Sequence, residues 1–188
     1  MTKFILHGGR TSLPIPENKL FFREIVKGLK SPIKLLIIYF SREGAEWPEL
    51  LRQDRPRFIS AAGGRKVDIM LANKDPNEFI IQLKKAKAVY MRGGDTLKLM
   101  KSLSRVKNFK ELLKDKVVAG SSAGAYVLAK YFYSNDRKKV FKGFSVLPIK
   151  VFGHYTSDKD KVLEKLKKHK ENLKTYAIEE GKFVVIKN

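Results

Sequence analysis

A continuous apolar run near the N-terminus places the strongest limit on the fold. Residues 33–40 read IKLLIIYF, and β-branched and aromatic side chains dominate the run. A strand with one face in water alternates between apolar and polar residues, so this run predicts a strand buried on both faces. Strands of that kind belong to parallel sheets that carry helices on each side.

The rest of the chain alternates between strand-like runs and helical patterns up to residue 133, and further strands surround one helix after residue 138. This alternation predicts βαβ units with right-handed crossovers. We therefore predict an α/β fold, a single three-layer domain over residues 1–188 with a mainly parallel central sheet. The predicted strands are 4–7, 33–40, 66–71, 88–91, 116–119, 140–144, 146–152, 176–178 and 183–186, and the predicted helices are 17–29, 47–62 (interrupted near Pro56), 75–86, 96–103, 109–114, 123–133 and 158–173.

Composition narrows the possible functions. The chain has no cysteine, which excludes disulfides and thiolate nucleophiles and fits a cytoplasmic protein. Its three histidines lie far apart in the sequence, so we expect no metal site. No apolar run approaches the ~20 residues that span a membrane, and the first residues indicate a strand rather than a signal peptide.

The net charge of +21 favours anionic partners. The lysines are nevertheless spread along the whole chain, and the densest stretch, 161–170, carries Val162, Leu163 and Leu166 at helical spacing. This pattern indicates an amphipathic helix whose lysines form the solvent-exposed face. We therefore expect solvated surfaces rather than a dedicated nucleic-acid groove.

A short glycine and serine motif suggests chemistry. Residues 120–124 read GSSAG, which matches G-x-S-x-G with Ser122 at its centre. A predicted strand precedes the motif and a predicted helix follows it, which is the context of a nucleophile elbow. The alternative is that Ser121 and Ser122 merely cap a helix after a glycine turn. We favour Ser122 as a nucleophile, with the Ala123 N–H at the helix start as an oxyanion donor and Ser121 pointing away from the substrate.

A nucleophilic serine needs a base, and the base needs an orienting acceptor. His154 is the best candidate for the base because it follows a predicted strand and a bend at Gly153. His7, at another strand end, is the competitor, whereas His169 is expected to face solvent. The candidate acids are Asp136, Asp158 and Glu180, and spacing alone does not rank them.

A second glycine motif follows the predicted strand 88–91. Residues 92–96 read RGGDT, and glycines there let the backbone approach a ligand and offer N–H donors. The alternative is an ordinary strand-to-helix turn capped by Asp95 or Thr96. The motif lacks the patterns of nucleotide-binding loops, so we predict a second oxyanion donor rather than a nucleotide site. The same absence applies to the stretch 7–10, HGGR.

Taken together, these motifs resemble the peptidase E family, the aspartyl dipeptidases and their relatives the cyanophycinases. The resemblance extends over most of the chain. It is carried by 93–96 (GGDT), 120–125 (GSSAGA), 134–136 (SND), 142–148 (KGFSVLP), 154–155 (HY) and 178–181 (IEEG).

The resemblance implies a class I glutamine amidotransferase-like α/β fold and no cofactor. It implies Ser122 as nucleophile and His154 as general base, with Gly94 and Ala123 donating to the oxyanion. It favours Asp136 as the acid, and Glu180 remains the alternative because some relatives use a glutamate.

The chain departs from the family pattern at Arg92, where a third glycine is usual, and at Asp95, where asparagine is usual. It is also shorter around the first helices and near His154, where loops help to hold the substrate's acidic side chain. We expect a cytoplasmic serine peptidase acting on short peptides, including Asp-Xaa dipeptides, as a monomer or homodimer. The alternatives are a serine acyl hydrolase with other substrates and a basic binding protein with a relic site.

Overall fold

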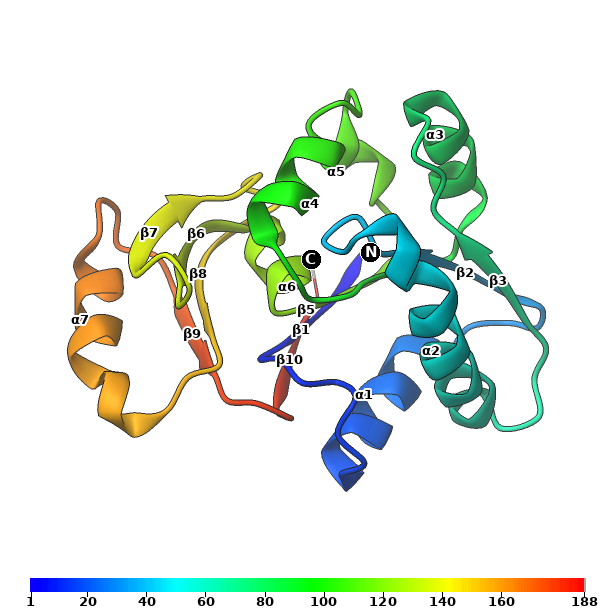
Figure 1. Ribbon diagram of the computed structural model, residues 1–188, viewed down its shortest axis with the longest axis horizontal. Coiled ribbons are helices and arrows are strands. Elements are labelled where there is room, and N and C mark those ends of the chain that lie inside the picture. Colours follow the sequence, from blue (N-terminus) through cyan, green and yellow to red (C-terminus); the bar gives the residue numbers. More distant parts are fainter. Residues whose placement is uncertain (188) are drawn as a thin grey trace.

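The computed structural model describes residues 1–187 and contains two β-sheets with helices packed against them (Figure 1). The larger sheet has six strands in the order β10-β1-β5-β4-β2-β3. All of its neighbouring strands are parallel except the pair β1 and β10. Its strands are β1 (Lys3–His7), β2 (Ile33–Ile38), β3 (Val67–Leu71), β4 (Ala88–Met91), β5 (Val117–Ser121) and β10 (Phe183–Lys187).

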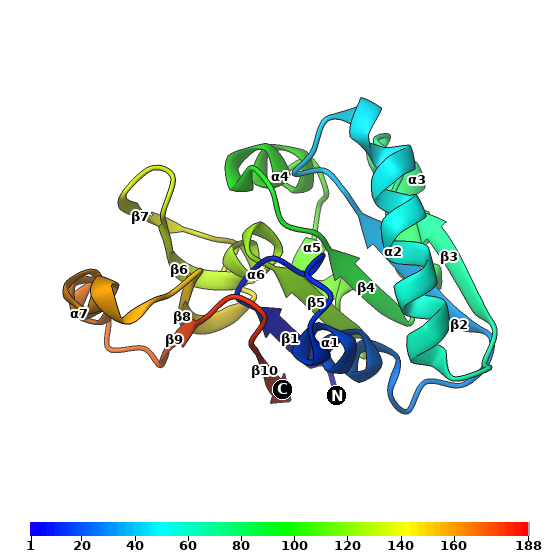
Figure 2. The same cartoon turned by 60° about the horizontal axis from the view of Figure 1, so that its bottom comes forward.

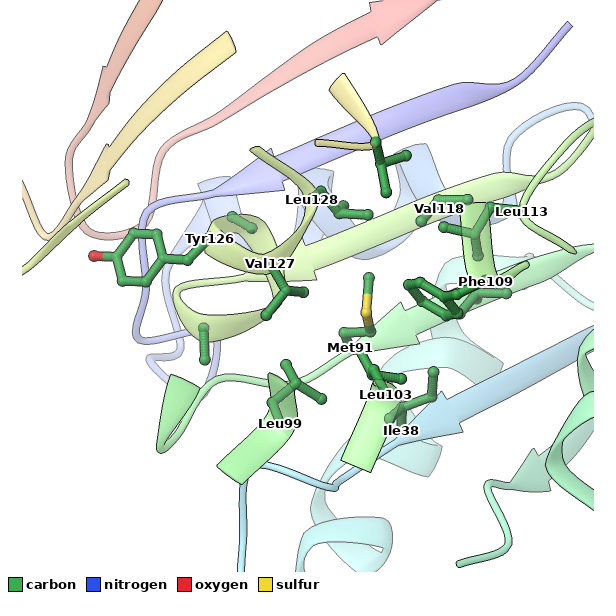
Figure 3. Close-up of a cluster of buried hydrophobic side chains, with 14 of the residues drawn as sticks. Ile38, Met91, Leu99, Leu103, Phe109, Leu113, Val118, Tyr126, Val127 and Leu128 are labelled. Carbon is green, nitrogen blue, oxygen red and sulfur yellow. The ribbon is translucent and has the colours of Figure 1, made fainter. Parts of the chain in front are cut away.

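Both faces of this sheet are covered, as the apolar run in β2 predicts. Leu35 and Ile37 face α1 (Pro16–Val26) and α2 (Trp47–Ala62), whereas Leu36 and Ile38 face the opposite layer. Figure 3 shows part of that second layer, where side chains of α4 and α6 meet those of β4 and β5. The helices of the second layer are α3 (Pro76–Lys85), α4 (Thr96–Leu103), α5 (Phe109–Leu112) and α6 (Ala123–Leu128).

The smaller sheet has four strands in the order β7-β6-β8-β9. It lies with α7 on one side of the molecule, and α2 and α3 lie on the other (Figure 2). The two sheets share one apolar core, since Phe132, Val151 and Ile178 belong to the same buried cluster as Leu36. The remaining elements are β6 (Ala129–Ser134), β7 (Lys139–Lys142), β8 (Leu147–Gly153), α7 (Asp160–Lys168), β9 (Thr175–Ile178) and the short 3₁₀ turns η1 (Gly44–Glu46) and η2 (Ser157–Lys159).

The predicted α/β class with mainly parallel strands is confirmed, but several element boundaries differ. The helix expected over 123–133 ends at Leu128, because Ala129 turns to an extended conformation (φ −73°, ψ 161°) and the following aromatic residues pair with β7 and β8. α2 runs through Pro56 without a break, since its buried side chains keep helical spacing on both sides of the proline. The helices expected over 109–114 and 158–173 are shorter than predicted, ending at Leu112 and Lys168.

Among the helices of residues 1–187, none combines the length and the hydrophobicity needed to cross a lipid bilayer.

Candidate active site

Ser122 occupies a strained turn between β5 and α6. Its backbone adopts φ 49° and ψ −108°, a conformation that side-chain-bearing residues rarely take. Its N–H donates to the carbonyl oxygen of His7 at 2.9 Å, and its carbonyl accepts from Ala125 and Tyr126 at the start of the helix. The turn is therefore fixed from both sides at the carboxyl edge of the parallel strands, where ligands bind in α/β sheets.

The glycines of the motif are required by close backbone packing. A Cβ added at Gly120 would lie 2.3 Å from the carbonyl group of Gly124, and one added at Gly124 would lie 2.3 Å from the carbonyl oxygen of Met91. Both distances are far below any real Cβ contact, so no larger residue fits without moving backbone. These contacts explain the small residues on either side of Ser122 in physical terms.

Ser122, His154 and Glu180 form a continuous chain of contacts. The Oγ of Ser122 lies 3.0 Å from Nε2 of His154, and Nδ1 of His154 lies 2.7 Å from Oε1 of Glu180. Both distances are within hydrogen-bond range. With Nδ1–H donating to the carboxylate, Nε2 is left unprotonated and can accept the proton of the serine hydroxyl.

The second oxygen of Glu180 is held by Arg10. The Nε of Arg10 lies 3.0 Å from Oε2, although the guanidinium side chain is 62% exposed. Glu180 follows β9, and Arg10 belongs to the loop after β1, so two segments at opposite ends of the chain meet beside His154. The carboxylate is thus oriented by one partner on each oxygen.

The backbone around His154 is fixed by four further contacts. Its N–H donates to the carbonyl oxygen of Gly8 at 2.8 Å, and its own carbonyl accepts from Nζ of Lys159 at 2.8 Å. The preceding carbonyl, that of Gly153, accepts from the hydroxyl of Tyr126 at 3.2 Å and from Nδ2 of Asn135 at 2.9 Å. These contacts hold His154 at a positive φ of 52°, which it would not adopt unaided.

Gly9 makes room for the histidine ring. A Cβ at this position would lie 2.1 Å from Cε1 of His154. Gly8, Gly9 and Arg10, which follow β1, are therefore part of the site, although the sequence alone assigned them no role.

His7 has a different environment from His154. Its ring is fully buried, Nδ1 accepts the N–H of Gly9 at 3.0 Å, and Nε2 lies 2.9 Å from Oδ1 of Asn18. Asn18 donates its two amide hydrogens to the carbonyl oxygens of Arg10 and Leu13, so its Oδ1 must accept from His7. Burial lowers the pKa of His7 to about 4, which keeps the ring neutral. His7 thus supports the loop that carries Arg10 and does not contact Ser122 through its ring.

The glycine loop after β4 lies against the elbow. A Cβ at Gly93 would be 3.1 Å from the Cβ of Ser122, and one at Gly94 would be 2.5 Å from the carbonyl oxygen of Ser41. The carbonyl oxygen of Gly93 accepts from Nε of Arg42 at 2.9 Å. Ala123 opens α6, so its N–H has no acceptor within that helix. The predicted oxyanion donors, Gly94 and Ala123, therefore belong to the two segments that flank Ser122.

Arg92, which stands where the family pattern has glycine, points into the core. It forms an ion pair with the buried carboxylate of Asp54, whose Oδ2 lies 2.8 Å from its Nη1. The same carboxylate accepts from the hydroxyl of Tyr39 at 2.9 Å and from Arg57 at 2.9 Å. Burial, with the neighbouring Asp54 adding to it, raises the pKa of Tyr39, so the phenol remains a neutral donor.

An open pocket of about 330 Å³ lies over Ser122 and His154. Asp136 lines this pocket, but within residues 1–187 it has no hydrogen bond to His154; Asp158 is exposed in η2, and His169 packs its ring against Tyr131 on the far sheet. Ser121, expected to face away, is buried but also lines the pocket. No group of three or more His, Asp or Glu side chains in the described part of the chain could hold a metal ion.

A serine on a strand-to-helix turn, next to a histidine that contacts a carboxylate, is the arrangement found in α/β serine hydrolases. The model of Peptidase family S51 matches residues 52–188, and the chain therefore belongs to this family of serine-type peptidases. A search of curated proteins found no match.

Two solved structures share the fold. A peptidase from an acI-B1 actinobacterium superposes with a TM-score of 0.70 at 22% identity, covering 99% of this chain and 83% of that one. A protein assigned as peptidase E from Listeria monocytogenes EGD-e superposes with a TM-score of 0.67 at 16% identity, covering 99% of this chain and 94% of that one. At these identities the likeness shows the fold alone.

Proposed function

We propose that the chain hydrolyses short peptides with Ser122 as nucleophile, His154 as general base and Glu180 as the carboxylate that orients His154. The observation that carries this proposal is the unbroken path from Oγ of Ser122 through both ring nitrogens of His154 to Oε1 of Glu180. Glu180 replaces Asp136 as the favoured acid because it, and not Asp136, lies within hydrogen-bond distance of Nδ1.

The geometry supports the usual acyl-transfer sequence. The Ser122 Oγ attacks the peptide carbonyl carbon while Nε2 of His154 takes its proton, and the N–H groups of Gly94 and Ala123 stabilise the oxyanion. His154 then passes the proton to the leaving amine, which leaves an acyl group on Ser122. A water molecule, deprotonated by His154, releases the acid and restores the serine.

The charge of the pocket favours acidic peptides, including Asp-Xaa dipeptides. Three arginines, Arg10, Arg42 and Arg92, line the pocket, against one carboxylate, Asp136. Arg92 is buried against Asp54, whereas Arg10 and Arg42, although paired with Glu180 and Glu46, are exposed and within reach of a substrate carboxylate. We propose the cytoplasm as the site of this activity.

The nucleophile is tested with Ser122→Ala and a panel of Asp-Xaa dipeptides, neutral dipeptides and esters. We expect turnover to fall about 10³-fold or more, and a fluorophosphonate probe to label wild-type protein at Ser122 and the variant not at all. Ser104→Ala, at the exposed end of α4, is the control and should label normally. Wild-type activity in Ser122→Ala, or no labelling of the wild type together with salt-sensitive binding to nucleic acid, would overturn the proposal.

A further inference from the structure

A second pocket begins where the catalytic pocket ends. It has a volume of about 220 Å³ and lies between η1, the start of α2, the loop after β3 and α4. Arg42 is the one residue that lines both this pocket and the one over Ser122. We call it the Arg42 pocket.

The floor of the Arg42 pocket is aromatic. Phe40, Trp47 and Phe79 line it, and their rings pack on one another, with Phe40 5.9 Å from Trp47 and 5.1 Å from Phe79 between centroids. The indole N–H of Trp47 donates to the carbonyl oxygen of Arg42 at 3.4 Å. The floor is therefore tied to the residue that joins the two pockets.

The rim of the pocket is cationic and only partly neutralised. Lys98 pairs with Glu43, and Arg42 lies 3.6 Å from a carboxylate oxygen of Glu46. Lys74 and Arg105 also line the pocket, and neither forms an ion pair with any residue in 1–187.

Lys74 rests on the aromatic floor instead. Its Nζ lies 4.8 Å from the centre of the Trp47 ring. A weak cation–π contact of this kind is readily exchanged for a carboxylate.

We propose that the Arg42 pocket is a subsite for an acidic residue of the peptide substrate, other than the residue whose carbonyl carbon Ser122 attacks. The volume is smaller than the ~300–1,000 Å³ of pockets for larger ligands and suits a single side chain. Excess positive charge selects a carboxylate, and the aromatic floor accepts the aliphatic part of a glutamate. The proposal rests on the proposed peptidase function and extends its substrates from dipeptides to acidic peptides of three or more residues.

Arg42 also contacts the glycine loop after β4, which carries the proposed oxyanion donor Gly94. Arg42 donates through Nε to the carbonyl oxygen of Gly93, the residue before Gly94. A carboxylate that engages the Nη end of Arg42, which now lies 3.6 Å from Glu46, leaves this Nε contact in place. Substrate bound in the Arg42 pocket therefore contacts the side chain that holds the loop facing Ser122.

Trp47 is the only tryptophan of the chain, so its fluorescence reports this pocket directly. The experiment titrates full-length Ser122→Ala, which binds without turnover, with Asp-Ala-Glu and Glu-Asp-Ala. The matched peptides carry Gln in place of Glu and so lose only that carboxylate, and Asp-Ala and inorganic phosphate complete the set. We expect a saturable fluorescence change with an acidic tripeptide and at least 10-fold weaker binding of its Gln counterpart.

The pocket is then altered in the same background. Lys74→Gln with Arg105→Gln should weaken binding of the acidic tripeptide about 10-fold or more. Lys84→Gln with Lys85→Gln removes two exposed lysines at the end of α3 that do not line the pocket, and should leave binding unchanged. Equal binding by the two double variants overturns the subsite, as does equal binding of the Glu peptides and their Gln counterparts or a response to phosphate alone.

The subsite and the proposed function fail separately. If wild-type protein hydrolyses none of the peptides in the panel, the proposed function is wrong whatever Trp47 reports. If Asp-Ala is hydrolysed but acidic tripeptides leave the fluorescence unchanged, the peptidase stands and the subsite is wrong.

Discussion

At the scale of single residues, the geometry of the site depends on Glu180, whose two carboxylate oxygens contact different partners. One faces Nδ1 of His154 and the other faces Arg10, so neither can rotate away without breaking a charged contact. A carboxylate held at both ends keeps the imidazole in the tautomer whose Nε2 accepts from Ser122. Arg10 is thus a positioning residue that acts through Glu180, and its partial exposure also leaves it open to substrate.

The choice between the two candidate acids can be settled by paired substitutions. Glu180→Gln preserves the shape of the side chain but removes its charge, and we expect kcat to fall about 10²–10⁴-fold. Asp136→Asn changes a pocket-lining carboxylate that does not touch His154, so its effect should fall mainly on KM for acidic peptides. Steady-state kinetics on Asp-Ala measures both, and a larger loss of kcat in Asp136→Asn than in Glu180→Gln would return the role to Asp136.

At the scale of elements, the turn from β5 into α6 depends on backbone contacts so close that only glycine fits at two of its positions. Gly120 lies against the Gly124 carbonyl group, and Gly124 lies against β4. The helix therefore begins directly above the neighbouring strand, and Ser122 must bridge the gap in its strained conformation.

Gly120→Ala should show what this packing contributes. The added methyl group would lie 2.3 Å from backbone atoms, and we expect a loss of about 3 kcal/mol or more in unfolding free energy, with loss of activity. Gly64→Ala is the control, because nothing lies within 4 Å of its added Cβ and only its positive φ of 84° makes the change unfavourable, by about 1 kcal/mol. Thermal unfolding compares them at roughly 2–4 °C per kcal/mol, and equal shifts would show that the close packing does not matter.

The difference between local patterns and contacts of distant segments explains what the sequence could predict. The elbow, the strand before it and the alternation of strands with helices are local patterns, and the sequence predicts them because each depends on neighbours within a few residues. The contact between His154 and Glu180 joins a bend after β8 to a turn after β9, and Arg10 arrives from the other end of the chain. No spacing rule relates such positions, so the roles of Gly9 and Arg10 emerged only in three dimensions.

The early end of α6 has a similar origin. Residues 129–134 read AKYFYS, which continues a helical pattern acceptably when read alone. Pairing with β7 and β8 satisfies the backbone N–H and C=O groups of this segment and buries Phe132 in the shared core. Tertiary pairing therefore overrides a weak local preference.

At the scale of the whole molecule, His7 joins the sheet, α1 and the loop that carries Arg10. Its neutral ring accepts from Gly9 and donates to Asn18, and Asn18 in turn holds the loop carbonyls. Protonation would add a second ring hydrogen facing the Gly9 N–H, inside a fully buried site. This arrangement links the stability of the fold to pH.

The sign of that linkage follows from the pKa values. The folded state holds the pKa of His7 at about 4, against 6.5 in the unfolded chain, so between those values the unfolded state binds more protons. Stability is then fully present above pH 6.5 and falls as the pH drops toward 4, by about 3 kcal/mol in total. Denaturant unfolding across this range should show the slope in wild-type protein and a flatter profile in His7→Gln. His169→Gln, which alters a ring on the far sheet, should keep most of the slope, and a wild-type slope in His7→Gln would rule out His7 as its source.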